Sequence, residues 1–269
     1  MTDTSNHDGP SLEQLLESGM LPAEILHPGG LEITRELAEL CEIGLGRKVL
    51  DVASGTGEAA CFLAETFQCH VVGIDASEYM IERAREKTQS RKLDIEFQQG
   101  DAHALPFEEN AFDAVISECT TCVLDKARAI REMTRVTKPG GHVGIHDLCW
   151  KEDSPDELKQ QLSELENEHP ETLDGWKQLF EVAGLTQIVT REKSDLLADW
   201  TTDVKKQLGF TGQLKIYWNI IRQWGFGGLR HVMKSEQVFQ NEHLGYGVIV
   251  GTKPLAATSP EIPLASNNS

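Results

Sequence analysis

Between Leu31 and Leu148, short apolar runs alternate with amphipathic helical patterns. The apolar runs predict strands at 48–53, 70–75, 95–98, 112–117 and 142–146. Apolar positions spaced three and four apart predict helices at 58–67 and after Ser77 and Asp125, which we expect to cap them. Strict alternation of strand and helix specifies right-handed crossovers, so the fold class is α/β: a doubly wound, mostly parallel sheet with helices on both faces.

After Leu148 the pattern changes. Residues 151–174 hold nine acids and two lysines, which predict a solvated helix face rather than an acidic docking surface. A helix at 172–183 and strands at 186–190 and 244–254 follow. The aromatic-rich segment at about 193–243 is too long for a loop, so we expect a helical insertion before the last strand, acting as a lid. Polar ends at 1–21 and 255–269 predict mobile tails around one domain at 22–254, with its core at 31–150.

Charge and composition narrow the function classes. The chain has 25 Lys and Arg against 43 Asp and Glu, a net charge of −18, which disfavours binding to nucleic acid and to anionic lipid surfaces. No apolar run reaches the roughly 18 residues that a membrane span needs, and the polar start lacks the features of a signal peptide. We therefore expect a cytoplasmic protein whose six cysteines are free thiols; its oligomeric state is left open.

A glycine turn follows the first predicted strand. Gly55 and Gly57 allow close approach of a ligand to the backbone, and the helix behind them offers unpaired N–H groups. With Ala60 in the third position, the turn also satisfies a relaxed dinucleotide fingerprint. Asp75, about twenty residues on, suits ribose binding, although capping of the next helix is the alternative. Asp51 places a negative charge beside the turn, which favours a cationic ligand over a pyrophosphate.

Four motifs in order carry a family resemblance: Val49-Leu-Asp-Val-Ala-Ser-Gly-Thr-Gly57, Val72-Gly-Ile-Asp-Ala-Ser77, Gln99-Gly-Asp-Ala102 and Lys138-Pro-Gly-Gly141. Over about 27–150 the chain resembles class I S-adenosylmethionine-dependent methyltransferases. Ala53 stands where that family usually has glycine. The resemblance implies a Rossmann-like sheet, S-adenosyl-L-methionine as cofactor and methyl transfer as the reaction.

The same resemblance implies the roles of individual residues in binding the cofactor. It implies contacts from Ala53, Ser54, Gly55 and Gly57 to the methionine part, above Asp51; from Asp75 to the ribose; from Ala76, Met80, Asp101 and Ala102 to the adenine; and from Glu118 to the sulfonium and substrate.

The acceptor should meet the ends of the fourth and fifth strands. We expect Glu118, Cys119 and His146 there as catalytic candidates, with Glu118 or His146 taking a proton, although His146 could equally bond loop backbone. Cys119 and Cys122 form a Cys-x-x-Cys pair, but the other candidate ligands, His142, His146 and Cys149, lack the regular spacing of a second pair in a structural zinc site. This disfavours a metal site. The surroundings of Cys119 resemble those of a cysteine in arsenite methyltransferases. The alternative interpretation, that Cys119 is simply a small buried side chain, also stays open.

The sequence thus predicts an S-adenosylmethionine-dependent methyltransferase, acting on a small-molecule acceptor by in-line transfer. Three alternatives remain at this point. They are a metalloid or thiol methyltransferase, a NAD-dependent oxidoreductase favoured by Ala60, and a catalytically silent cofactor-binding scaffold that docks through the acidic stretch.

Overall fold

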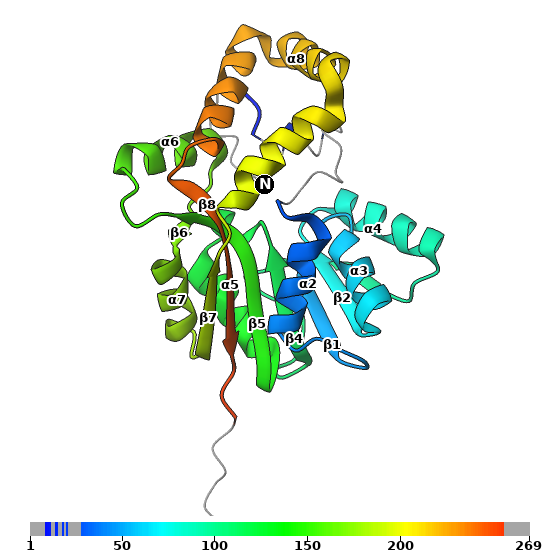
Figure 1. Ribbon diagram of the computed structural model, residues 1–269. Coiled ribbons are helices and arrows are strands. Elements are labelled where there is room, and N and C mark those ends of the chain that lie inside the picture. Colours follow the sequence, from blue (N-terminus) through cyan, green and yellow to red (C-terminus); the bar gives the residue numbers. More distant parts are fainter. Residues whose placement is uncertain (1–8, 12–13, 16–17, 19, 21–27, 256–269) are drawn as a thin grey trace, which may run out of the picture.

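The computed structural model describes residues 9–11, 14–15, 18, 20 and 28–255, without the side chains of 195–205 and 207. Most of the two predicted tails, 1–21 and 255–269, therefore lies outside the described residues. The strands form one sheet in the order β3-β2-β1-β4-β5-β8-β7, and β6 pairs with β5 (Figure 1). Their bounds are β1 Lys48–Val52, β2 His70–Asp75, β3 Glu96–Gln99, β4 Phe112–Glu118, β5 Thr137–Trp150, β6 Glu171–Thr172, β7 Thr186–Glu192 and β8 Leu244–Thr252.

Helices cover both faces of this sheet (Figure 1). On one face lie α2 Gly30–Leu40, α3 Glu58–Phe67 and α4 Glu78–Arg91; on the other lie α5 Lys126–Val136 and α7 Leu173–Val182. The acidic stretch forms α6 Asp156–Glu166, and the insertion forms α8 Asp195–Phe239. The strands β1 to β5 pair in parallel, while β8 runs antiparallel to both β5 and β7. The predicted fold class is confirmed.

The alternation of side chains in β1 explains how one sheet serves two cores. Val49 packs into the core beneath α2, α3 and α4, whereas Leu50 packs into the core beneath α5 and α7. Asp51 and Val52 follow and are also buried. A carboxyl group in a strand that is covered on both faces has no access to bulk water, so it needs a partner or a ligand.

Two details differ from the sequence prediction, and a third agrees with it. The fifth strand runs to Trp150 rather than ending at His146, because β8 pairs with it from His142 onward. Ser77 occupies the N-cap position of α4 but makes no side-chain cap bond. By contrast, Asp125 caps α5 as predicted, by accepting from the Arg128 N–H at 3.1 Å.

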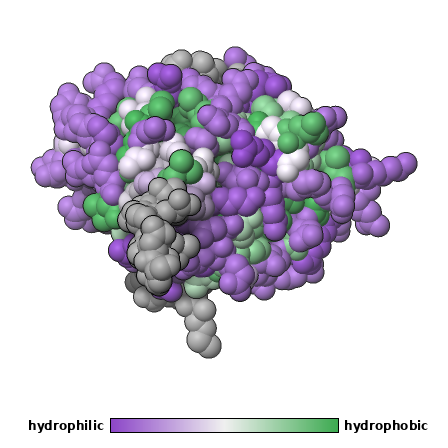
Figure 2. Space-filling model, turned by 90° about the horizontal axis from the view of Figure 1, so that it is seen from below, coloured by the Kyte–Doolittle hydropathy of each residue, from purple (hydrophilic) through white to green (hydrophobic). Residues whose placement is uncertain are grey.

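The insertion lies at one end of the sheet. Its last helix leads into Leu244, which pairs with Trp150 at the carboxyl end of β5, so α8 stands above the carboxyl ends of the parallel strands (Figure 1). Gly209 and Gly225 break α8 with non-helical dihedral angles, dividing it into three pieces. The opposite end of the molecule is mostly hydrophilic, with separated apolar patches (Figure 2). Within the described part of the chain, every helix is too short or too polar to cross a membrane.

Candidate active site

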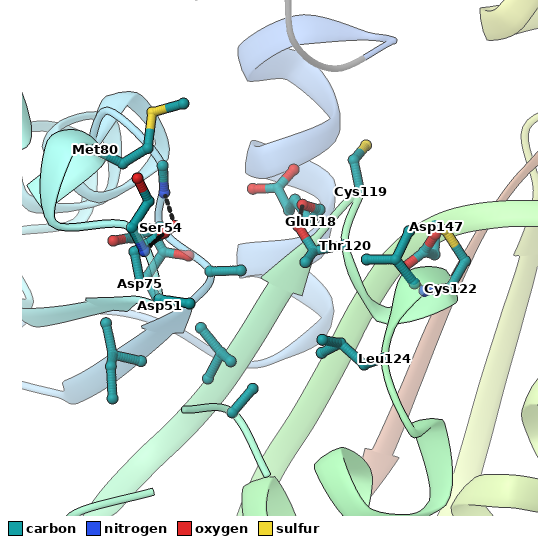
Figure 3. A pocket seen from close by; sticks show the side chains of 18 of the residues that line it. Asp51, Ser54, Asp75, Met80, Glu118, Cys119, Thr120, Cys122, Leu124 and Asp147 are labelled. Carbon is teal, nitrogen blue, oxygen red and sulfur yellow. Dashed lines mark hydrogen bonds between the residues drawn. The ribbon is translucent and has the colours of Figure 1, made fainter. Parts of the chain in front are cut away.

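A cavity of about 450 Å³ opens where the carboxyl ends of β1, β2, β3, β4 and β5 meet. Its volume falls in the usual range for small-molecule and cofactor sites. Figure 3 shows side chains from β1, β2 and α4 on one side of it and side chains from the ends of β4 and β5 on the other. Most of the predicted site residues line it: Asp51, Ala53, Ser54, Gly55, Asp75, Ala76, Met80, Asp101, Ala102, Glu118 and Cys119.

The glycine turn gives the cavity its floor. Gly55 has φ +51°, and a Cβ placed there would meet nothing within 4 Å, so its backbone faces open space. Gly57 has φ +74°, but it does not line the cavity, so its predicted contact with the cofactor stays a prediction. A Cβ at Gly57 would lie 2.7 Å from the Phe97 ring and 3.0 Å from Ala84, so this glycine lets α3 pack close to β3 and α4.

Ala53 adopts a conformation that suits glycine. Its φ is +59°, in the left-handed region that L-residues enter at a cost of roughly 1–2 kcal/mol. The family pattern usually has glycine here, so the structure supplies the physical reason for that preference. Ala53 still lines the cavity, and its small side chain leaves the turn open to a ligand.

Asp75 ties the turn to the start of α4. Its Oδ2 accepts from the Gly55 N–H at 2.9 Å and its Oδ1 from the Ser77 N–H at 2.9 Å. Burial raises the pKa of Asp75, while the bonds from backbone N–H groups act in the opposite direction. Asp75 therefore provides the acceptor at the start of α4 that was predicted for the Ser77 side chain. It also lines the cavity, so the two alternatives considered for it are compatible.

Asp51 is a buried carboxyl group with an unused oxygen. Its side chain is 2% exposed, and its Oδ2 has no hydrogen-bond partner among the described residues. Burial raises the pKa of Asp51 well above its ordinary value, and the nearby charges of Glu118 and Asp75 raise it further. Figure 3 shows Asp51 and Asp75 on the same side of the cavity. A cation bound here would relieve both the desolvation and the repulsion.

The third strand leads to Asp101 and to a partner that the sequence analysis missed. His103 donates from Nδ1 to Asp101 Oδ1 at 2.7 Å, because its Nε2 already accepts from the Asp125 N–H at 3.0 Å. The backbone N–H of His103 bonds the same oxygen and is the main cause of the lowered pKa of Asp101. The ionised carboxylate keeps Oδ2 available to a ligand. The sequence held a signal for this pair, because His103 follows Asp101 by two positions just after a predicted strand.

The opposite side of the cavity begins at Glu118. Both of its carboxylate oxygens lie within hydrogen-bond distance of Thr34 Oγ1, at 3.0 and 3.2 Å, so α2 helps to fix this side chain. Thr34 lies 84 residues before Glu118, and the local sequence around it does not indicate a residue of the site. Next to Glu118, Cys119 has φ +57°, and its N–H donates to the His146 carbonyl at 2.7 Å.

His146 lies behind the wall rather than in it. It is fully buried and absent from the lining, with its Nδ1 3.7 Å from Cys119 Sγ and its ring 5.0 Å from that of Tyr246. His146 therefore does not meet the cavity directly, and the catalytic role predicted for it stays a prediction. Tyr246, from β8, lines the cavity in its place.

Asp147 holds the loop that follows Cys119. Its Oδ2 accepts from the Cys122 N–H at 3.1 Å and its Oδ1 from the Leu148 N–H at 2.8 Å. Burial, followed by the charge of Asp147, raises the pKa values of Cys119 and Cys122 well above the ordinary value, so both thiols stay protonated. All six cysteines are free. Within the described residues, no cluster of three or more His, Cys, Asp and Glu side chains could hold a metal ion.

Comparison with known proteins identifies the family. A methyltransferase domain matches residues 44–206. A phosphoethanolamine N-methyltransferase of Triticum aestivum is 34% identical over 62% of this chain and 33% of its own length, so the chain spans about a third of that relative. An arsenite methyltransferase of Halobacterium salinarum is 31% identical over 59% of the chain and 43% of its own length.

Among solved structures, the chain is similar to phosphoethanolamine N-methyltransferase 2 of Haemonchus contortus in complex with S-adenosyl-L-methionine. The TM-score is 0.72 at 20% identity, covering 94% of this chain and 58% of that one, which shows a shared fold. The four sequence motifs, the cavity at the strand ends and the domain match agree. The chain belongs to the family of S-adenosylmethionine-dependent methyltransferases.

Proposed function

We propose that this chain transfers the methyl group of S-adenosylmethionine to a small-molecule acceptor that is neutral or cationic. The observation that carries the proposal is the buried, unpartnered oxygen of Asp51 beside the open backbone of Gly55. A buried carboxyl group without a partner costs stability unless a ligand supplies one. S-adenosylmethionine carries two positive groups, an ammonium and a sulfonium, and so suits a site where three acids converge.

The residues present fit the cofactor along the whole cavity. Asp51 would pair with the ammonium, and Asp75 would exchange part of its bonding to backbone for the ribose hydroxyls. Asp101, oriented by His103, would accept from the adenine amino group, while Ala76, Met80 and Ala102 would pack against the ring. When bound, the cofactor supplies an electrophilic methyl group. The chain's own contribution is to orient it, exclude water and hold the acceptor in line.

Glu118 is the residue we assign to the reacting end. It lines the cavity at the end of β4, and Thr34 holds its carboxylate in place. There it would stabilise the sulfonium and accept a proton from a protic acceptor. Cys119 lines the same region as a neutral thiol, and His146 supports it from behind.

The acceptor end of the cavity is acidic and partly aromatic. Glu118, Asp147 and Glu168 line it together with Phe239 and Tyr246, and none of the described lining residues is a lysine or arginine. A phosphate group would meet repulsion there without a positive partner. The acceptor that this charge pattern favours is an amine or an uncharged hydroxyl or carbon nucleophile. A phosphate ester, such as the wheat relative's name denotes, is disfavoured.

Methylation of a metalloid is the second candidate, supported by the arsenite methyltransferase relative and by Cys119 at the cavity. A soft metalloid binds the thiolate form. The raised pKa values of Cys119 and Cys122 oppose that form, so we rank this candidate below the first.

Two measurements test the main proposal. Isothermal titration should show binding of S-adenosylmethionine and its demethylated product, and no comparable binding of NAD. A methyl-transfer assay should then give turnover with amines or phenols and little with phosphate esters or arsenite. Tighter binding of NAD, or turnover confined to phosphate esters, would contradict the proposal.

Three further predictions belong to this function. We keep the insertion at 193–243 as a lid; Phe239, at the end of α8, is its described side chain that lines the cavity. A single domain at 22–254 and a cytoplasmic location also stay predictions, the latter supported by free thiols, which are typical of a reducing compartment.

A further inference from the structure

One segment of this acidic chain is basic. Residues 204–235 contain Lys205, Lys206, Lys215, Arg222, Arg230 and Lys234 and no Asp or Glu, so all 43 acidic residues of the chain lie outside this segment. Screening limits the reach of a surface charge to about 8 Å at physiological ionic strength. The basic segment therefore acts on its surroundings by its local charge and not by the net charge of −18.

The same segment exposes large apolar side chains. In the piece of α8 between Gly209 and Gly225, Phe210, Leu214 and Trp218 follow one another at intervals of four and are 77%, 51% and 66% exposed. Residues spaced by four form one ridge along a helix. Arg222 continues this ridge by one more turn, and it is exposed, as is Lys215.

The last piece of α8 repeats this combination. Phe226 and Met233 are 76% and 51% exposed, and Arg230 and Lys234 are exposed on the same side of the helix. The opposite side is buried, at His231 and Ser235, so the exposed face is the outer face of a helix that is packed onto the domain.

The exposed apolar and basic side chains at 210–234 in α8 contribute neither to the cavity nor to ion pairs among the described residues. Among the described side chains of α8, none of the five large apolar residues that are exposed lines the cavity. In the described part of the chain, Lys215, Arg222, Arg230 and Lys234 have no ion-pair partner, whereas every base of α4 pairs with a neighbouring acid, for example Arg91 with Glu58. A surface that combines large apolar side chains with unpaired bases is suited to an external partner.

We propose that the exposed sides of these two pieces of α8, at 210–222 and 226–234, dock onto an anionic lipid surface. Interfacial helices combine Trp, Phe and Leu, which enter the headgroup region, with Lys and Arg, which bind lipid phosphates. Protein interfaces, by contrast, are depleted of lysine. The two lysines that lie among the exposed aromatic residues, Lys215 and Lys234, therefore favour a membrane over a protein partner.

The position of this surface gives docking a functional consequence. The α8 helix stands over the carboxyl ends of the strands, and Phe239 at its end lines the cavity (Figure 1). Docking through α8 would hold the cavity on the side of the protein that faces the lipid, where an acceptor that partitions into membranes is concentrated. The docking itself needs no methyl transfer and is measured without an acceptor.

Vesicle co-sedimentation tests the proposal. The full chain should bind vesicles of phosphatidylcholine with phosphatidylglycerol, bind less as salt increases, and bind weakly to phosphatidylcholine alone. The double variant Trp218→Ser, Arg222→Glu should lose affinity by about tenfold or more, since each base near the surface contributes about fivefold. The matched control Leu45→Ser, Lys92→Glu changes the charge equally and removes one exposed apolar side chain far from α8, and it should bind as wild type does.

Thermal unfolding and titration with S-adenosylmethionine show whether both variants are folded. Equal binding to both kinds of vesicle, no binding to either, or equal losses in the variant and the control would each overturn the proposal. Sedimentation velocity adds one more overturning result: self-association that the α8 variant abolishes, without vesicle binding, would assign this face to a second copy of the chain. If wild type docks on vesicles but does not bind the cofactor, the proposed function fails and the docking surface stands.

Discussion

Replacing Asp51 by Asn should stabilise the fold and weaken cofactor binding at the same time. The carboxyl is 2% exposed and leaves Oδ2 without a partner among the described residues, so at neutral pH it carries a desolvation cost of about 1–3 kcal/mol. Asparagine has nearly the same shape and no charge. For a chain of this size, each kcal/mol recovered should raise Tm by about 2–4 °C.

The stability difference between Asp51→Asn and wild type should depend on pH. The folded-state pKa of Asp51 is raised above its unfolded value, so the folded protein holds the proton more tightly than the unfolded chain. Stability is therefore fully present below the ordinary pKa of 3.8 and falls as pH rises toward the folded pKa, by at most about 1.36 kcal/mol per pH unit. The advantage of Asp51→Asn should vanish near pH 4 and grow toward neutral pH.

The affinity for S-adenosylmethionine should fall in Asp51→Asn, although the stability of the fold should rise. A charge-assisted hydrogen bond contributes about 1.5–3 kcal/mol, so Asp51→Asn should weaken binding of S-adenosylmethionine about ten- to hundredfold. Asp147→Asn is the matched control, because Asp147 is equally buried but both of its oxygens accept from backbone N–H groups. That variant should lose stability. A lower Tm for Asp51→Asn at neutral pH, or unchanged cofactor affinity, would refute the reasoning.

Three further predictions follow from the same site. Ala53→Gly should raise stability by about 0.5–1 kcal/mol in chemical denaturation, because relief of the φ of +59° exceeds the added freedom of the unfolded chain; a loss would show that Ala53 is not strained. Asp75→Ala should lower both Tm and cofactor affinity, since its carboxylate bonds Gly55 and Ser77; unchanged affinity in titration would leave it only the capping role. Cys119→Ser should retain methyl transfer to amines or phenols, and wild-type activity confined to metalloids and lost in the variant would reverse our ranking of acceptors.

The order of strands and helices could be predicted because its causes are local. Apolar spacing distinguishes strand from helix within each segment, and the crossover rule then leaves few ways to assemble them. The cofactor side was predictable for a related reason: Asp51, Asp75 and Asp101 each lie near the carboxyl end of a strand, and the carboxyl ends of parallel strands meet at one edge. The sequence could not separate the two possible roles of Gly57, because tight helix packing and ligand approach place the same demand on a backbone.

The acceptor side depends on contacts between distant parts of the chain. Thr34 reaches Glu118 across 84 residues, and Tyr246 enters from β8, after the whole insertion. Which residue of β5 faces the cavity is decided by that pairing, in which Tyr246 lies opposite Leu148 and Val248 opposite His146. Asp147 and Leu148 both line the cavity, whereas His146, one position earlier in β5, does not. Because the fully buried imidazole contacts Cys119 and Tyr246, which do line the cavity, we expect His146 to act as a positioning residue for the acceptor through these two side chains.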